Sequence, residues 1–223
     1  MHIHSRPCSG GGDEIENHIT ELKKKGYAGM VITNHFINGD TKIDRTLSWP
    51  EFVEAYREDY ERGRIFAEQL DFDLLFGIEE QVGNGKEILV YGISPDFLER
   101  NPSLKSGDAA EYARLVHNEG GLVFQAHPYR DRFYITDPGP IAELELLDGI
   151  EVYNAANEPE ENKKAALLAK EKGLRCTVGS DGHSQSSAGR TAIVSKERIR
   201  TNEKLVEILK SGDYGFYIEQ NQG

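Results

Sequence analysis

The sequence predicts a single α/β domain built as a β/α barrel, and three observations carry this prediction. Short apolar runs alternate with amphipathic helical segments along the 223 residues. The runs are almost continuously hydrophobic, which is typical of strands in a parallel sheet covered by helices. Roughly seven such strand–helix units fit a closed barrel better than an open sheet. No linker, repeat or low-complexity segment divides residues 1–223.

The strands are expected where apolar runs of strand length are bounded by turn residues. These runs lie at residues 1–4, 28–33, 72–79, 87–93, 121–126, 149–154, 175–180, 192–195 and 214–218. Between the third and fourth runs, Gly83, Asn84 and Gly85 predict a hairpin turn.

The helices are expected in the amphipathic segments between these strands, at residues 13–25, 48–70, 108–120, 140–147, 159–172 and 202–212. Gly26 ends the first of them. Ser48 and Glu51 have the spacing of a capping box at the start of the second. Asp108 and Glu111 begin the third in the same pattern, and a glycine pair ends it.

Composition and charge disfavour several classes of function. The formal net charge of −12 argues against non-specific binding to duplex nucleic acid. It leaves a small phosphorylated substrate open, because bound cations reverse the local charge. The apolar runs are too short to cross a membrane, and the N-terminus does not resemble a secretory signal. With only Cys8 and Cys176 present, a reducing cytoplasm is expected rather than a disulfide framework.

Residue types that ligate metals stand at the ends of successive predicted strands. They are His2, His4, His35, Glu79, His127, Asp181 and His183. In a β/α barrel these strand ends open onto one face. Each residue alone has an ordinary explanation, such as a turn or a strand-end hydrogen bond, but their joint occurrence favours a multinuclear metal site. His18 and His117 lie inside helical segments and are expected to be ordinary helix residues.

These motifs resemble those of the PHP family, the polymerase and histidinol phosphatase domain. The matching stretches are HIHS, VITNHF, GIE, AHP and GSDGH, in the family's order from residue 2 to residue 183. The resemblance implies a distorted seven-stranded, TIM-like barrel with its metal site at the C-terminal ends of the strands. It also implies two or three divalent metal ions (Zn, Mn or Fe) and hydrolysis of phosphate esters.

The resemblance also implies which residues share each metal, with Glu79 bridging the first two. The three sets are His2, His4, Glu79 and Asp181; Glu79 and His127; and His35 and His183.

The chain departs from the family pattern at three places. Asn34 stands where relatives usually carry Asp in Thr-Asp-His. Glu87 replaces a histidine and is assigned to the second metal, where a carboxylate favours Mn or Fe over Zn; the alternative is a charged edge-strand residue. In CSGGGD, a carboxylate for the third metal is either missing at Ser9 or displaced to Asp13.

In the implied reaction, a water activated between two metals attacks phosphorus, with Glu79 and Asp181 essential. His183 or His35 would protonate the leaving alkoxide if not fully committed to metal. Arg130 and Arg190 are the preferred phosphate clamps, ahead of Arg6 and Arg132. Nearby aromatic side chains either line a pocket or simply pack: Tyr129, Phe133 and Tyr134.

The predicted function is therefore a phosphomonoesterase acting on a small phosphorylated metabolite, such as histidinol phosphate or a nucleotide. Three alternatives stay open: a metal-dependent amidohydrolase, an exonuclease acting on nucleic-acid ends, and a non-catalytic metal-binding domain. Glu79 in the bridging position, where an amidohydrolase often has lysine, favours the phosphoesterase, as does the pairing of Asp181 with His183. The oligomeric state is left open.

Overall fold

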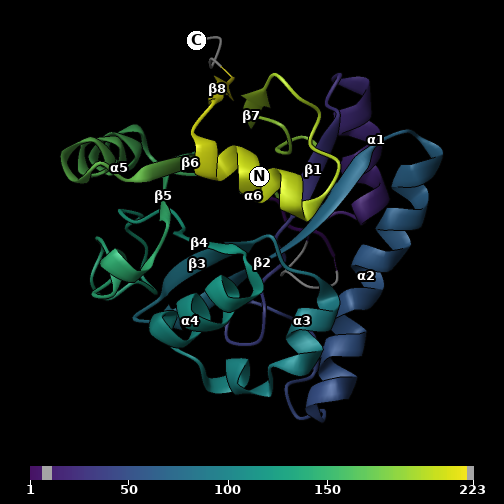
Figure 1. Cartoon of the computed structure of the whole chain (residues 1–223), viewed down its shortest axis with the longest axis horizontal. Coiled ribbons are helices and arrows are strands. Elements are labelled where there is room, and N and C mark those ends of the chain that lie inside the picture. Colours follow the sequence, from purple (N-terminus) through teal and green to yellow (C-terminus); the bar gives the residue numbers. More distant parts are fainter. Residues whose placement is uncertain (7–11, 220–223) are drawn as a thin grey trace.

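The computed structural model describes residues 1–6 and 12–219. They form an α/β fold around a curled six-stranded sheet whose spatial order follows the chain (Figure 1). The strands are β1 (Gly29–Ile32), β2 (Asp73–Gly83), β3 (Lys86–Tyr91), β4 (Leu122–Gln125), β5 (Gly149–Asn154) and β6 (Arg175–Gly179). The sheet has the curvature of half a barrel, in keeping with the predicted TIM-like architecture.

The N-terminal residues lie between the two edges of this sheet. Ile3 forms a parallel bridge with Gly182, just beyond β6, and accepts a hydrogen bond of 2.9 Å from Thr33 N, just beyond β1. A seventh strand was expected here, but the pairing is a single bridge. It ends because Ser5 N donates to the side-chain oxygen of Asn34 (2.7 Å) instead of to a neighbouring strand.

One strand of the sheet runs against the others. β3 is antiparallel to both β2 and β4, whereas the remaining pairs are parallel. The hairpin turn predicted before β3 makes this reversal, and Asn84 and Gly85 have positive φ angles of 55° and 73° there. Such angles suit the tight turns that join antiparallel strands. As a result, β3 begins at the end of the sheet where the parallel strands finish.

Six helices occur in the described residues. They are α1 (Ile15–Lys24), α2 (Trp49–Gln69), α3 (Pro95–Arg100), α4 (Ala109–Glu119), α5 (Pro159–Lys172) and α6 (Asn202–Ser211). α6 differs from the others because it packs on the concave side of the sheet. A 3₁₀ turn, η1 (Pro102–Ser106), follows α3; neither of these two was predicted. At the start of α2, Ser48 N donates to the carboxylate of Glu51 (3.0 Å), as the capping-box pattern predicted.

The prediction of a helix at residues 140–147 is wrong. Only a 3₁₀ turn, η2 (Leu144–Leu146), forms there. Its buried side chains, Ile141, Leu144 and Leu147, repeat every third residue, which is the period of a 3₁₀ turn rather than of an α-helix. The backbone has the same period, because Leu144 N donates to Ile141 O (3.3 Å) and Leu147 N donates to Leu144 O (3.2 Å).

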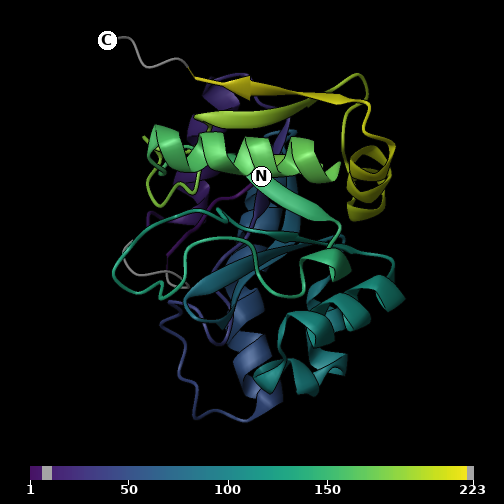
Figure 2. The same cartoon turned by 90° about the vertical axis from the view of Figure 1, so that its left-hand side faces the viewer.

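The last two strands lie outside the six-stranded sheet. β7 (Thr191–Ser195) and β8 (Tyr214–Ile218) pair as an antiparallel ribbon, seen along one side of the molecule in Figure 2. None of the helices in the described part of the chain combines the length and the apolar character needed to cross a membrane.

The pleat of β2 and β3 separates two environments. Leu75 of β2 and Leu89 of β3 face the concave side of the sheet, where α6 covers an apolar core. Ile78 and Ile88 face the opposite side and pack against α2 and α4. Since side chains alternate between faces, Glu79 shares the concave side with Leu75 and Leu89, above the α6-covered core.

Candidate metal centre

All the histidines and carboxylates predicted from the strand ends converge at one end of the concave side. Among residues 1–6 and 12–219, four groups of three have ligand atoms that all lie within 4.8 Å of one another. Together the groups comprise His2, His4, His35, Glu79, Glu87, His127, Asp181 and His183. We call these residues the His–carboxylate cluster.

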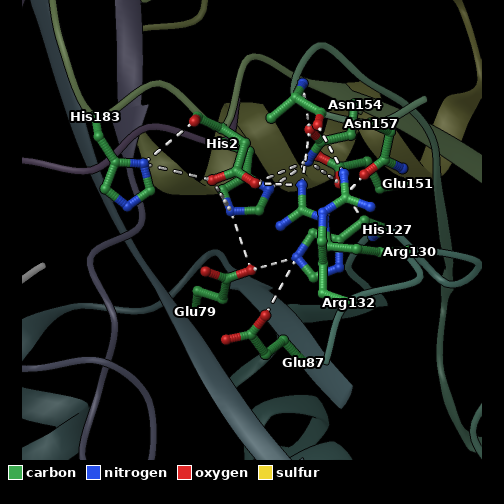
Figure 3. Close-up of polar contacts among 12 residues, drawn as sticks. His2, Glu79, Glu87, His127, Arg130, Arg132, Glu151, Asn154, Asn157 and His183 are labelled. Carbon is green, nitrogen blue, oxygen red and sulfur yellow. Dashed lines mark hydrogen bonds and ion pairs between the residues drawn. The ribbon is translucent and has the colours of Figure 1, made fainter. Parts of the chain in front are cut away.

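Glu79 contacts four histidines of the cluster. Figure 3 shows its carboxylate between His2 and His127. One carboxylate oxygen, Oε1, is 3.0 Å from His2 Nε2 and 3.1 Å from His127 Nε2. The other, Oε2, is 3.3 Å from His4 Nε2 and 3.0 Å from His35 Nδ1. A single carboxylate therefore faces four imidazoles, which is the arrangement expected of a residue that bridges metal sites.

Asp181 forms the second acidic corner of the cluster. Its Oδ1 lies 3.2 Å from His4 Nε2 and 3.6 Å from His2 Nε2. Its Oδ2 accepts a hydrogen bond of 2.5 Å from Arg130 Nη2. Arg130 is itself buried, and it also donates to Asn154 and Asn157. The arginine predicted as a phosphate clamp thus holds a cluster carboxylate in place.

Glu87 joins the cluster because β3 is reversed. Lying at the start of an antiparallel strand, it sits beside the ends of the parallel strands. Its Oε2 is 3.3 Å from His127 Nε2, and its Oε1 is 3.6 Å from His35 Nδ1. Glu87, which was expected to share a metal with His127, therefore lies beside that histidine.

Glu151 is a cluster neighbour that the sequence analysis missed. It is buried in β5, where Oε1 lies 3.0 Å from His2 Nδ1 and Oε2 accepts from His127 N (3.1 Å) and Asn154 Nδ2 (2.9 Å). A carboxylate behind a metal-ligating histidine fixes the orientation of the ring. The available signal was a glutamate in the middle of the apolar run GIEVYN.

Two cluster residues have unusual backbone conformations. His127 has φ 26° and Asp181 has φ 47°, in the left-handed region that side chains other than glycine seldom adopt. Such strain persists only where surrounding contacts impose it, and it is concentrated at functional sites. Here the constraint comes from hydrogen bonds that His127 N donates to Glu151 and Asp181 N donates to His2 O.

Burial and charge oppose each other within the cluster. Burial alone would lower the pKa of His2 and His35, but the carboxylates around them, above all Glu79, raise it, to about 9 for His35. Conversely, burial would raise the pKa of Glu79, yet His2 and His35 hold it well below its usual range. The buried acids therefore require positive charge beside them.

The donor set fits divalent metal ions. Three buried ring nitrogens lie 3.0–3.3 Å from carboxylate oxygens without the geometry of a hydrogen bond: His2 Nε2, His4 Nε2 and His35 Nδ1. His4 Nδ1 also has no hydrogen-bond partner among the described residues. Two ligands that each lie about 2.1 Å from one ion are separated by roughly 3.0–3.4 Å. The closest nitrogen–oxygen separations in the cluster, 3.0–3.3 Å, match that spacing. Mixed imidazole and carboxylate ligands suit Zn, Mn and Fe.

Several other predicted residues lie away from the cluster. In the described part of the chain, Arg190 pairs with Glu219 (3.5 Å) and has no ion pair with the cluster, so its clamp role stays a prediction without structural support. The remaining arginines pair with carboxylates, Arg6 with Glu14 and Arg132 with Glu161.

Asp13, the displaced third-metal carboxylate in the prediction, supports the loop that carries His183 instead. Its Oδ2 accepts from Gln185 N (2.7 Å), and its own N donates to His183 O (2.8 Å). Cys8 and Ser9 lie outside the described residues, and Cys176 is a half-buried free thiol.

The mouth of the cluster is marked by its most exposed members. The His183 side chain is 41% exposed, and burial together with nearby His4 lowers its pKa to about 4, which leaves the imidazole neutral. Phe133 is fully exposed and makes an edge-to-face contact with Tyr134. Burial raises the pKa of Tyr134, while nearby Arg130 opposes that rise. Phe133 and Tyr134 are therefore aromatic side chains on the loop that follows Arg130.

The two histidines expected to be ordinary helix residues do lie in helices. His117, near the end of α4, pairs with Asp148 (2.8 Å) outside the cluster. His18 is completely buried in α1, where burial lowers its pKa to about 4.

Part of the chain matches a known family model. A family model described as PHP-associated matches residues 159–214. No curated protein sequence matches the chain.

Similar solved structures share the fold at low sequence identity. A two-domain protein from Bacteroides vulgatus containing a predicted PHP-like metal-dependent phosphoesterase is 19% identical, with a TM-score of 0.71 over 98% of this chain. This chain spans only 63% of that protein. An amidohydrolase from Chromobacterium violaceum with bound sulfate is 17% identical, with a TM-score of 0.61 over 93% of this chain and 95% of that one.

A third similar structure is the lesion-specific endonuclease from Pyrococcus furiosus. It is 16% identical, with a TM-score of 0.59 over 97% of this chain and 56% of that one. These findings agree with the resemblance drawn from the motifs: residues 159–214 match a PHP-associated family model, and the chain shares the fold of a protein with a predicted PHP-like phosphoesterase domain.

Proposed function

We propose that this chain is a metal-dependent phosphomonoesterase that acts on a small phosphorylated metabolite. The observation that carries the proposal is the His–carboxylate cluster around Glu79, whose carboxylate faces four imidazoles at 3.0–3.3 Å. The distribution of ligands into overlapping groups supports two or three metal positions rather than one.

Each metal position is assigned to cluster residues whose ligand atoms lie close together. The first position would be held by His2, His4 and Asp181 together with Glu79. The second would be held by His127 and Glu87, with Glu79 shared between the two positions. A third would be held by His4, His35 and His183. Bound divalent ions would supply Lewis-acid activation of the phosphate and of a water molecule.

The chain's own residues would orient the reactants. Arg130 holds Asp181 and adds a buried positive charge beside the cluster, where the charge on a phosphate ester must be balanced. The neutral, half-exposed imidazole of His183 suits metal ligation at the mouth of the site better than proton donation. Glu151 keeps the His2 ring in the orientation that points Nε2 toward Glu79.

Two other hydrolytic functions share the observations in part. The similar structures include an amidohydrolase and an endonuclease, and both show the same fold as this chain. The net charge of −12 weighs against a nucleic-acid substrate. Glu79 at the bridging position weighs against the amidohydrolase reading, which often uses lysine there.

The test is phosphate release from a panel of phosphomonoesters, including histidinol phosphate and nucleotides, with added Mn²⁺ or Zn²⁺ and with chelator. Chelator-sensitive release by the wild type, lost in Glu79→Gln and kept in His117→Ala, would support the proposal. His117 is the matched control because it is a histidine outside the cluster. Cleavage of DNA ends or of amides instead, with no phosphomonoester turnover, would overturn the proposal.

A further inference from the structure

A buried polar network connects helix α2 to two segments of the cluster. Ser5 follows His4 directly, and Asn34 precedes His35 directly. Ser5 N donates to Asn34 Oδ1 (2.7 Å), and Asn34 Nδ2 donates to Ser5 Oγ (3.0 Å). The two cluster segments are thus joined side chain to backbone, one residue away from their histidines.

Asp59 of α2 anchors this junction. It is 2% exposed, and its Oδ2 accepts a hydrogen bond of 2.5 Å from Ser5 Oγ and a longer one of 3.5 Å from Asn34 Nδ2. Its Oδ1 accepts from Arg62 Nη2 (2.7 Å). Asp59 therefore accepts hydrogen bonds from both junction residues and from Arg62, and it is the group that ties α2 to the junction.

The histidines on either side of the junction belong to one group of potential ligands. The rings of His4 and His35 stack with centroids 4.4 Å apart, and His4 and His183 stack at the same distance. A displacement of Ser5 relative to Asn34 would move His4 relative to His35. The group formed by these three histidines is therefore the part of the cluster most dependent on the network.

We propose that Asp59 is a positioning residue for the three-histidine group, acting through Ser5 and Asn34 to set the separation of His4 and His35. This rests on the proposed binding of metal by the cluster. Asp59 touches no cluster ligand in the contacts described, so its effect passes entirely through the two junction residues.

Asn34 and Asp59 are complementary as hydrogen-bond donor and acceptor. One amide and one carboxylate meet at Ser5, so the junction carries a single negative charge. In Asn34→Asp, two buried carboxylates would meet at about the present 3.5 Å separation, and their repulsion would push the segments apart. In Asn34→Asp/Asp59→Asn, one amide and one carboxylate are present again, with their positions exchanged. Arg62 keeps its ion pairs with Glu14 and Glu16.

The experiment is calorimetric titration of metal-free protein with Co²⁺, with the visible absorption of bound Co²⁺ as a second readout. The proteins are wild type, Asp59→Ala, Asn34→Asp, the double variant and the control Glu58→Ala, whose side chain is exposed on the same helix. The melting temperature of each metal-free protein reports on the fold separately.

We expect Asp59→Ala and Asn34→Asp to weaken the weakest class of Co²⁺ site by about 10–100-fold, the usual effect of removing a residue that supports a ligand. The double variant should recover most of this loss, and Glu58→Ala should match the wild type. Unchanged Co²⁺ affinity in Asp59→Ala, or a double variant no better than Asn34→Asp, would overturn the proposal.

The double variant also covers the case in which Asp59→Ala does not fold, because its comparison with Asn34→Asp is independent of that protein. If the wild type binds Co²⁺ normally but the variants do not differ, the positioning role alone fails. If the wild type binds no divalent ion, both this role and the proposed function fail.

Discussion

Glu79 and Glu80 are adjacent, belong to the same strand and are both buried, yet they lie in opposite environments. The pleat points Glu79 into the His–carboxylate cluster, where imidazoles face both of its oxygens. Glu80 points to the other side of β2, where Oε1 accepts from Asn38 N (3.0 Å). Its Oε2 has no hydrogen-bond partner among the described residues.

The two carboxyl groups therefore ionise differently. His2 and His35 hold the pKa of Glu79 well below its usual range, whereas burial raises the pKa of Glu80 to about 8. At neutral pH, Glu79 is an anion, and positively charged groups beside it are needed to balance its charge. Glu80 is mainly a neutral acid, and its hydrogen bond with Asn38 N holds the loop after His35. Burial of a glutamate is thus no sign of a metal site in itself; the groups that face it decide.

The largest effect is expected from replacing the ionised member of the pair. Glu79→Gln removes the charge that faces four imidazoles, so turnover should fall by about 10³-fold or more, corresponding to several kcal/mol of lost charge stabilisation. The measurement is phosphate release alongside metal content by elemental analysis. Full activity and full metal content in this variant would break the comparison.

Asp181→Ala should abolish turnover to a similar extent and also lower stability. It leaves the buried Arg130 without its carboxylate, and removing one partner of a buried ion pair costs about 3–5 kcal/mol. Thermal unfolding of the metal-free protein measures the second effect. Asp181→Asn, which keeps the side-chain volume, is the companion variant; a wild-type melting temperature in both would contradict the expected loss of stability.

Glu151 is a third buried glutamate that can be compared with Glu79 and Glu80. Glu151 contacts His2 from behind rather than from the metal side, so Glu151→Gln should weaken metal affinity by about 10–100-fold without abolishing binding. Metal titration of Glu151→Gln and Glu79→Gln in parallel measures this ranking. An effect of Glu151→Gln as large as that of Glu79→Gln would place it among the direct ligands.

The smallest effect on activity is expected for Glu80→Gln, whose readout is the pH dependence of stability. In the folded protein the pKa of Glu80 is about 8, above its ordinary value of 4.5. The folded state then retains a proton that the unfolded state releases, so Glu80 reduces stability as the pH rises from 4.5 to 8. Denaturant unfolding across that range should show a shallower decline in Glu80→Gln than in the wild type. Identical slopes would show that Glu80 is ionised when folded.

Much of the cluster could be predicted because the pattern that reveals each residue lies within a few neighbouring positions of the sequence. A histidine or carboxylate directly after an apolar run lies at a strand end, and His2 and His4 are spaced to share one side of an extended segment. The helices with clear capping and apolar periodicity were also confirmed, as α2 and α4 illustrate. The helix predicted at residues 140–147 was wrong because the buried side chains and the backbone hydrogen bonds of this segment both repeat every three residues.

The rest could not be predicted because it depends on contacts between distant segments. Glu151 meets His2 across 149 residues of sequence, and Asp59 meets Ser5 across 54. Arg190, by contrast, follows a motif closely in sequence, yet its guanidinium lies beside Glu219. Proximity along the chain and proximity in space diverge wherever a loop leads a side chain away from the strand end.

The sequence by itself determined which chemical groups are available and their order along an alternating β/α chain, since composition and periodicity are properties of neighbouring residues. The choice between Glu79 and Glu80 shows what only the tertiary structure decided. The parallel bridge between His35 and Glu79 sets the register of β2 beside the segment that follows β1. If the register of β2 were shifted by one residue, Glu80 instead of Glu79 would point into the cluster, because strand side chains alternate between faces.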